Sequence, residues 1–214
     1  MEVSQILSEL QCFLEISDVE NLEVNIMLVD QSNSRKSRYC GYMLKIKNED
    51  ILPSVMKTIE YLTTQLEMRQ LSEYDLVASV DDTTQTIEKN QVVFGDDILS
   101  KMTLQYNETN TVTDNTDLTK VDFIVMQICV GDNTIYIFKK YSQYTKAFQR
   151  SSQYVFSGGI LKPFNDTIIT ITDSVDAFLF KGTYYVFNRS AFHSIFCYQD
   201  VFKQVISENR TAII

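Results

Sequence analysis

The sequence has no tryptophan, one histidine, two prolines and six glycines among its 214 residues. A single histidine excludes metal centres that need several imidazoles. The glycines do not form the G-x-x-x-x-G-K spacing of a phosphate-binding loop, and the G-x-S-x-G spacing of serine hydrolases is missing too. No Asp or Glu is followed two positions later by Lys, so the usual carboxylate–lysine pair of restriction-type nucleases is not present either.

Long hydrophobic runs and paired cysteines are also missing. No apolar run approaches the roughly 20 residues of a membrane-spanning helix, and the N-terminus lacks the basic region of a signal peptide. The four cysteines form no C-x-x-C pair and lie among apolar residues; they are Cys12, Cys40, Cys129 and Cys197. These features are typical of a cytoplasmic protein with reduced thiols.

Charge is distributed unevenly along the chain, whose net charge is −9. Residues 1–120 carry ten Lys and Arg against 21 Asp and Glu, whereas residues 121–214 carry nine against seven. The change falls in a stretch at 106–120 that is rich in Thr and Asn and is expected to be a loop. We therefore expect an acidic α/β subdomain at 1–118 and a mostly β subdomain with terminal helices at 119–214, or one continuous domain.

Hydrophobic periodicity predicts an αββα order in the N-terminal part. Residues 3–14 have the spacing of an amphipathic helix, and residues 22–28 and 39–47 alternate as the strands of a hairpin would. A long helix follows, with Asn48 as its cap and Pro53 in its first turn.

Two weaker patterns predict a short strand at 74–80 and a short helix at 96–102. The acidic pairs Asp81–Asp82 and Asp96–Asp97 could each bind a divalent metal. Turn or N-cap positions suit them better, because no histidine or third carboxylate lies at ligand spacing.

The C-terminal half predicts several strands and terminal helices. Residues 121–130 are nearly all apolar, as in a central strand, and they form a hairpin with 134–138. The sequence then predicts a short helix at 142–150, followed by strands at 154–156, 167–172, 177–181 and 183–187. It ends with a helix capped by Ser190 and a second helix that begins at Asp200. The fold class is therefore α+β, with a mostly antiparallel sheet in the C-terminal half and helices against one face.

The window from 133 to 165 contains five basic residues and no Asp or Glu, and aromatic residues are interleaved with the bases. Lysine and arginine attract phosphate, and aromatic rings can stack on unpaired bases. The plain alternative is a strand and a helix with buried aromatic residues and solvated lysines. The candidate contacts for nucleic acid are Lys139, Lys140, Lys146, Arg150 and Lys162, followed by Arg35, Lys36 and Arg38 at the tip of the first hairpin.

Three further polar residues have ordinary structural explanations. Arg189 and His193 lie four positions apart and would share a helix face, but this spacing is one residue short of the Arg–His pattern of some defence ribonucleases. A partly buried histidine near a helix cap is the simpler interpretation. Asp176 is better explained as a residue that caps a turn between two strands than as a catalytic acid.

The order of several C-terminal segments resembles the KwaB-like family, the second component of the bacterial Kiwa anti-phage system. The resemblance covers residues 121–205. It rests on Phe138-Lys139-Lys140-Tyr141-Ser142, Phe164, the Asp176-Ala-Phe-Leu-Phe segment, Tyr184-Tyr185-Val186-Phe187-Asn188, and the segment from Phe192 to Tyr198.

The resemblance implies a cytoplasmic effector that binds phage DNA and works beside a membrane partner similar to KwaA, at the inner membrane through that partner. Family members are longer than this chain, so a C-terminal part is expected to be absent. No catalytic residue is transferred from the family. We expect a homo-oligomer with neither cofactor nor metal, and binding rather than catalysis.

A protein-interaction module is the rival prediction. In that case the acidic half docks onto a partner or a second copy of the chain, and the basic window is ordinary surface. A metal-dependent nuclease is a third possibility, which requires cleavage that a chelator abolishes.

Overall fold

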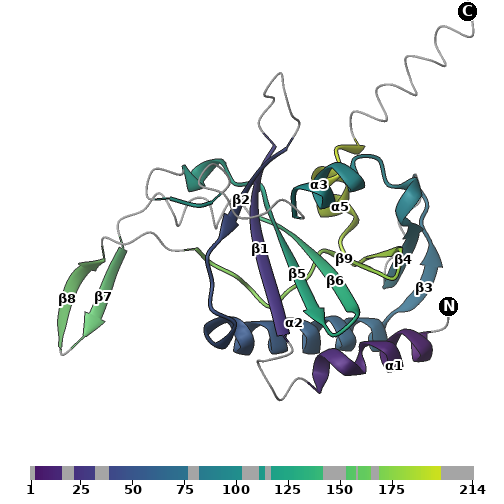
Figure 1. Cartoon of the computed structure of the whole chain (residues 1–214), viewed down its shortest axis with the longest axis horizontal. Helices are drawn as coiled ribbons and strands as arrows, with labels where there is room; N and C mark the ends of the chain where they lie inside the picture. Colours follow the sequence, from purple (N-terminus) through teal and green to yellow (C-terminus); the bar gives the residue numbers. More distant parts are fainter. Residues whose placement is uncertain are drawn as a thin grey trace, which may run out of the picture.

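The computed structural model describes residues 3–15, 22–31, 39–76, 82–102, 111–113, 117–141, 153–157, 159–164 and 169–198. Its main feature is an eight-stranded sheet with the order β2-β1-β5-β6-β9-β10-β4-β3 (Figure 1). The strands are β1 (Leu22–Asp30), β2 (Cys40–Leu44), β3 (Gln70–Glu73), β4 (Thr83–Glu88), β5 (Phe123–Val130), β6 (Asn133–Lys140), β9 (Ala177–Phe180) and β10 (Thr183–Val186).

All neighbouring strands of this sheet are antiparallel except β3 and β4, which are parallel. The α+β class and the mostly antiparallel sheet are therefore confirmed. The sheet is not confined to the C-terminal half, because β1 pairs along its length with β5 and β4 pairs with β10. The expected division between 118 and 119 does not separate two sheets.

Helices cover both faces of the sheet, which corrects the expectation that they cover one (Figure 1). The helices α1 (Val3–Leu14) and α2 (Asn48–Met68) pack on one face, and α3 (Gly95–Met102) and α5 (Arg189–Ile195) pack on the other. The reason lies in the nearly continuous apolar sequence of β5. Met126 and Ile128 join the core under α1 and α2, whereas Phe123 and Val125 join the core under α3 and α5.

The predicted αββα order of the N-terminal part is confirmed by α1, β1, β2 and α2. Asn48 is not the cap of α2, because it is the first helical residue and Lys47 occupies the N-cap position. The Asn48 side-chain amide instead donates to the Leu22 carbonyl at 2.5 Å, which ties α2 to β1. Pro53 lies inside the helix rather than in its first turn.

Two strand predictions differ from the structure where they can be compared with it. Residues 74–76 of the strand expected at 74–80 are not in a strand, residues 77–80 lie outside the described part of the chain, and a strand forms just before them, at β3. The described residues of the strand expected at 167–172, which are 169–172, are not in a strand either. A separate hairpin of β7 (Gln153–Ser157) and β8 (Ile160–Phe164) precedes them and lies away from the main sheet (Figure 1).

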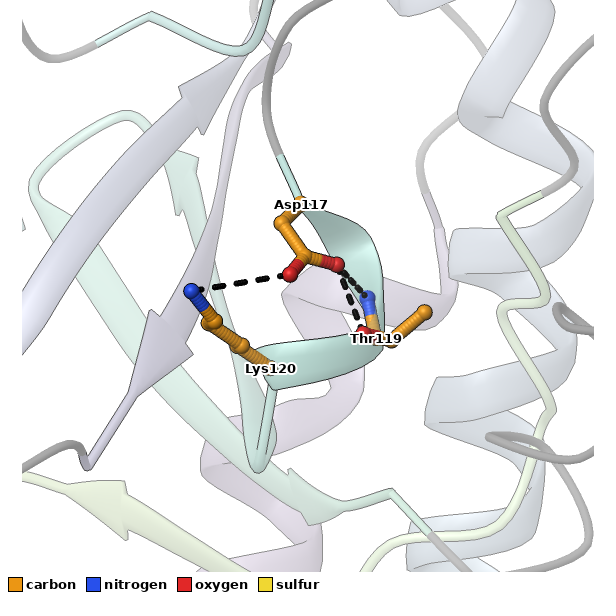
Figure 2. A network of polar contacts seen from close by, with 3 residues as sticks. All are labelled: Asp117, Thr119 and Lys120. Carbon is orange, nitrogen blue, oxygen red and sulfur yellow. Dashed lines mark hydrogen bonds and ion pairs between the residues drawn. The ribbon is translucent and has the colours of Figure 1, made fainter.

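Two short 3₁₀ helices, η2 (Lys89–Gln91) and η3 (Leu118–Lys120), complete the described elements. Asp117 caps η3 just ahead of β5 (Figure 2). Its carboxylate accepts from the Thr119 backbone N–H at 3.1 Å and from the Thr119 hydroxyl at 2.6 Å, and lies 3.6 Å from the Lys120 ammonium. These Thr119 bonds lower the pKa of Asp117.

Candidate nucleic-acid interface

The last residues of β6 place two predicted contacts next to each other. Phe138 pairs with Ala177 where β9 begins, so Lys139 and Lys140 extend beyond β9 and pair only with β5. Phe138 is fully buried, Lys139 is half-buried and Lys140 is exposed. Because side chains alternate along a strand, the two lysines leave the sheet on opposite sides.

Asp176 fixes the backbone around these lysines. One carboxylate oxygen accepts from the Lys140 backbone N–H at 2.8 Å, and the other accepts from the Asn188 side-chain amide at 2.9 Å. The Asp176 carbonyl also accepts from the backbone N–H groups of Phe187 and Asn188, both at 2.9 Å. Asp176 therefore joins the end of β6 to the start of α5, a structural role that extends beyond the single turn expected from the sequence.

Asn188, rather than Ser190, caps α5. Its side-chain oxygen accepts from the Ala191 backbone N–H at 3.1 Å, whereas Ser190 already lies inside the helix. The Asn188 side-chain oxygen thus caps the helix, and its side-chain nitrogen donates to Asp176.

These elements border an open cavity of about 550 Å³, which we call the lysine cavity. It is lined by Lys139, Lys140, Tyr141, Thr170, Thr172, Ser174, Asp176, Asn188, Ser190 and Ala191. The Tyr141 side chain is 5% exposed, and burial raises its pKa to about 12, so the phenol remains protonated. The Tyr141 hydroxyl has no hydrogen-bond partner among the described residues.

Lys139 is held by its neighbours. Its ammonium donates to the Ser174 carbonyl at 2.7 Å and contacts the Ser174 hydroxyl. Burial lowers the pKa of Lys139, and the carboxylates of Asp176 and Asp173 partly offset that effect. Lys139 therefore organises the cavity wall, and Lys140 is the more accessible cation.

The other predicted contacts are distributed more widely. Lys162 is exposed on β8, in the separate hairpin. Five predicted contacts lie outside the described residues: Lys146, Arg150, Arg35, Lys36 and Arg38. The helix expected at 142–150 and the one expected from Asp200 also fall there.

The aromatic residues beside Lys139 and Lys140 belong to the core rather than to a stacking surface. The Phe138 ring lies 5.3 Å from the Phe196 ring and 5.7 Å from the Tyr184 ring, measured between centroids. Tyr136 is half-buried and its hydroxyl accepts from the Gln127 amide at 3.2 Å. The rings of Phe138 and Tyr136 are therefore packed against other residues, as in the plain alternative, whereas Lys139 is half-buried and bonded to Ser174 rather than fully solvated.

A second cavity adjoins the first and was not anticipated from the sequence. It has a volume of about 620 Å³, and we call it the arginine cavity. It shares Ser174, Asp176 and Asn188 with the lysine cavity. Its other lining residues are Tyr61, Arg69, Asp82, Thr83, Gln85, Val175, Val186, Phe187 and Arg189.

His193 does not line this cavity and lies in a cluster of aromatic residues. Its Nε2 contacts the Tyr74 hydroxyl, and its ring stacks on Tyr198 at 5.3 Å between centroids. Burial, with Arg189 nearby, lowers the pKa of His193. Burial also raises the pKa of Tyr74, so a protonated phenol faces a neutral imidazole near neutral pH.

Carboxylates do not gather into a metal centre in the part of the chain that the structure describes, where no group of three His, Cys, Asp or Glu side chains could hold an ion. Asp96 and Asp97 lie in the first turn of α3, and Asp96 pairs with Lys89 at 3.0 Å. Within the same described residues, no helix is long and apolar enough to cross a membrane.

Comparison with known proteins identifies the C-terminal part. Residues 118–214 match the model of the family described as Kiwa protein KwaB-like. This match confirms the resemblance for the C-terminal part of the chain. Neither the curated proteins nor the solved structures include a significant match to the chain.

Proposed function

We propose that the protein is an anti-phage defence effector that binds DNA without cleaving it, mainly through phosphate contacts. The observation that carries the proposal is Lys140, an exposed cation on a backbone that the Asp176 carboxylate holds in place at the rim of a cavity. Phosphate contacts of this kind position nucleic acid without reading its sequence.

Lys162 supplies a second exposed cation in the same acid-free window. Lys146 and Arg150 belong to that window, and Arg35, Lys36 and Arg38 form a further basic group in the sequence. Lys139 is the less available contact, because its ammonium is already bonded to Ser174. The net charge of −9 favours a local groove over binding across the whole surface.

The family match supports a setting in a defence system of several components. We propose that the protein acts in the cytoplasm as a homo-oligomer, and that a membrane partner similar to KwaA holds it at the inner membrane.

The competing function is a protein-interaction module without nucleic-acid binding. The acidic sequence at 1–120 favours it, because a surface with many carboxylates repels DNA and suits a basic partner.

Fluorescence anisotropy with labelled duplex and single-stranded DNA at several salt concentrations tests the proposal. Affinity should fall linearly with salt on a log–log scale, with a slope of roughly 0.7 to 0.9 per phosphate contact. The variant Lys140→Ala/Lys162→Ala should bind more weakly with a smaller slope. Lys57→Ala, which removes an exposed charge from α2, is the matched control and should change neither quantity.

The outcomes separate the two functions. If the variant Lys139→Ala/Lys140→Ala/Lys146→Ala/Arg150→Ala folds and binds DNA with unchanged affinity, the proposed contacts are wrong. Failure of the unmodified protein to bind DNA even at low salt would reject the effector function and favour the interaction module.

A further inference from the structure

The two edges of the main sheet differ in what lies beside them. At the β2 edge, Met43 forms a parallel bridge with Thr111, and its carbonyl accepts from the Val112 backbone N–H at 3.0 Å. At the opposite edge, on the right of Figure 1, β3 is the last strand. In the part of the chain that the structure describes, β3 pairs with β4 alone, so its outer side has no strand partner.

The bonds between β3 and β4 show which backbone groups of β3 point outward. The Tyr74 backbone N–H donates to the Thr86 carbonyl at 2.9 Å, and the Ser72 carbonyl accepts from the Thr86 hydroxyl at 3.2 Å. These groups of Ser72 and Tyr74 therefore face β4. Because backbone groups alternate in direction along a strand, the N–H and C=O groups of Leu71 and Glu73 face away from β4. They form a short ladder of donors and acceptors, which is the pattern that an added strand bonds.

The charges around this ladder are mainly negative. Glu73 belongs to β3, Glu67 lies in the last turn of α2, which leads into β3, and both residues are exposed. The nearest base along the chain, Arg69, is engaged elsewhere, because its Nη1 donates to the Phe187 carbonyl just past β10 at 3.1 Å. A strand that suits this edge therefore carries lysine or arginine.

A second copy of the chain does not suit this edge. Antiparallel pairing of Leu71 in one copy with Glu73 in the other would place the two Glu73 residues diagonally on one face of the joined sheet. Pairing at Glu73 itself would place them directly opposite each other, where like charges destabilise a strand pair. Charged residues at sheet edges are a common means of preventing pairing between identical chains. An acidic edge that repels its own copies still accepts a basic strand.

We propose that the outer edge of β3 binds an extended basic segment of a partner protein, which extends the sheet by one strand. The backbone of that segment bonds the outward groups of Leu71 and Glu73, and its basic side chains lie near Glu67 and Glu73. Met68, which is 74% exposed at the end of α2, offers a contact for an apolar residue of the segment. The inference is independent of the proposed DNA binding, because β9, β10 and β4 lie between β3 and the strand that carries Lys140.

Fluorescence anisotropy with a labelled hexapeptide of alternating lysine and valine, its ends blocked, tests the inference. Saturable binding is expected at low salt, and it should weaken as salt screens the exposed charges. The same peptide N-methylated at every backbone nitrogen keeps its charges and loses its donors, so it should not bind. A glutamate–valine hexapeptide should not bind either. If the N-methylated peptide binds as tightly as the unmodified one, charge alone attracts it and the inference is wrong.

Glu73→Pro is the decisive variant, because it removes an outward N–H from an edge strand and leaves the bonds to β4 in place. It should weaken peptide binding by about tenfold or more. Glu67→Gln/Glu73→Gln removes only the charges and should weaken binding about fivefold at low salt. Asp132→Asn, which removes an exposed carboxylate from the turn between β5 and β6, is the matched control and should leave the affinity unchanged. If Glu73→Pro does not fold, the N-methylated peptide tests the same ladder in the unmodified protein.

Lys140→Ala separates this inference from the proposed function. It should reduce DNA affinity and leave peptide affinity unchanged, whereas Glu73→Pro should do the reverse. Sedimentation of the unmodified protein and of Glu73→Pro should give the same oligomeric state. Loss of an oligomer in Glu73→Pro would mean that β3 pairs between copies of the chain, which overturns the inference. Absence of peptide binding at low salt, or unchanged affinity in both β3 variants, also overturns it even if DNA binds.

Discussion

The Asp176 carboxylate accepts a hydrogen bond from the Lys140 backbone N–H at 2.8 Å, across 36 positions of the sequence. The bond forms where β6 has passed the start of β9, so Asp176 replaces the missing strand partner of Lys140. The most exposed predicted DNA contact in the lysine cavity is therefore held by an acid that forms part of the same cavity. Its geometry depends on Asp176 and, through Asp176, on Asn188.

Asp176→Ala and Asn188→Ala should each destabilise the protein by about 1 to 3 kcal/mol, because each removes hydrogen bonds of the β6–α5 junction. The double variant should cost less than the sum of the two, by about 0.5 kcal/mol or more, since both remove the same amide–carboxylate bond. Urea denaturation measures all three. Asp173→Ala, an exposed carboxylate in the same segment, is the control. Strictly additive costs would show that the two residues act independently.

His193 should make the stability of the protein depend on pH. Burial lowers its pKa in the folded protein below the value of about 6.5 in the unfolded chain. The contribution of neutral His193 to the free energy of unfolding is therefore complete above about pH 6.5. It is lost as the pH falls from there through the pKa of the folded state, because the unfolded state then binds more protons. The variant His193→Gln should lose less stability than the unmodified protein between about pH 7.5 and pH 5.5.

Thermal melts of both proteins at the two pH values provide this comparison. Carboxylates titrate equally in the two proteins, so their effect cancels when the change in stability of the variant is subtracted from that of the unmodified protein. The chain has one histidine, so its imidazole signal can be followed directly by NMR. A measured pKa at or above about 6.5 would contradict the prediction.

Tyr39 and Gln31 attach the C-terminal end of α5 to the edge of the sheet. The Tyr39 hydroxyl donates to the Ile195 carbonyl at 3.0 Å, and the Gln31 amide donates to the Ser194 and Ile195 carbonyls at 2.8 and 2.9 Å. Tyr39→Phe should cost about 1 kcal/mol and Gln31→Leu about 1 to 3 kcal/mol in the free energy of unfolding.

Tyr136→Phe is the matched control for these variants. Its hydroxyl takes part in one side-chain hydrogen bond on a half-buried residue, so the loss should be smaller. Equal losses for Tyr39→Phe and Tyr136→Phe would mean that the attachment of α5 contributes nothing beyond an ordinary hydrogen bond.

Gly95 at the start of α3 allows Tyr184 to approach. A Cβ atom added there would lie 2.8 Å from the buried Tyr184 hydroxyl, which is closer than van der Waals contact permits. Gly95→Ala should therefore destabilise the protein by roughly 1 to 3 kcal/mol, despite the better helix propensity of alanine. In a Tyr184→Phe background the same change should cost much less. Chemical denaturation of the four proteins gives the result, and an equal cost in both backgrounds would rule out the clash.

Elements with a regular apolar period could be predicted from the sequence, whereas elements fixed by distant partners could not. The alternation at 22–28 and the stripe at 3–14 carry their own signal, and both elements form there. The strand β4 was missed because its buried residues include Thr84 and Gln85, which interrupt the apolar pattern. Its conformation is fixed by pairing with β10 from the far end of the chain.

The residues of the two cavities also differ in whether the sequence alone could predict that they lie together. Lys139 and Lys140 are adjacent in an acid-free window, so the sequence alone drew attention to them. Arg69, Gln85 and Arg189 are distant along the chain, and they meet only because β4 pairs with β10. Sequence spacing offered no signal for that cavity, although Arg189 was considered for its position relative to His193.

The strand order has a consequence for synthesis on the ribosome. The central strands β5, β6, β9 and β10 are made last, yet β1 and β4, which are made first, pair with the two sides of that group. The edge of β1 waits unpaired until β5 has emerged, and that of β4 waits longer, until β10 has emerged as far as Val186; unpaired edges of nascent chains invite aggregation. We expect slow folding from this non-local pairing, and a nascent chain that depends on chaperones for most of its translation.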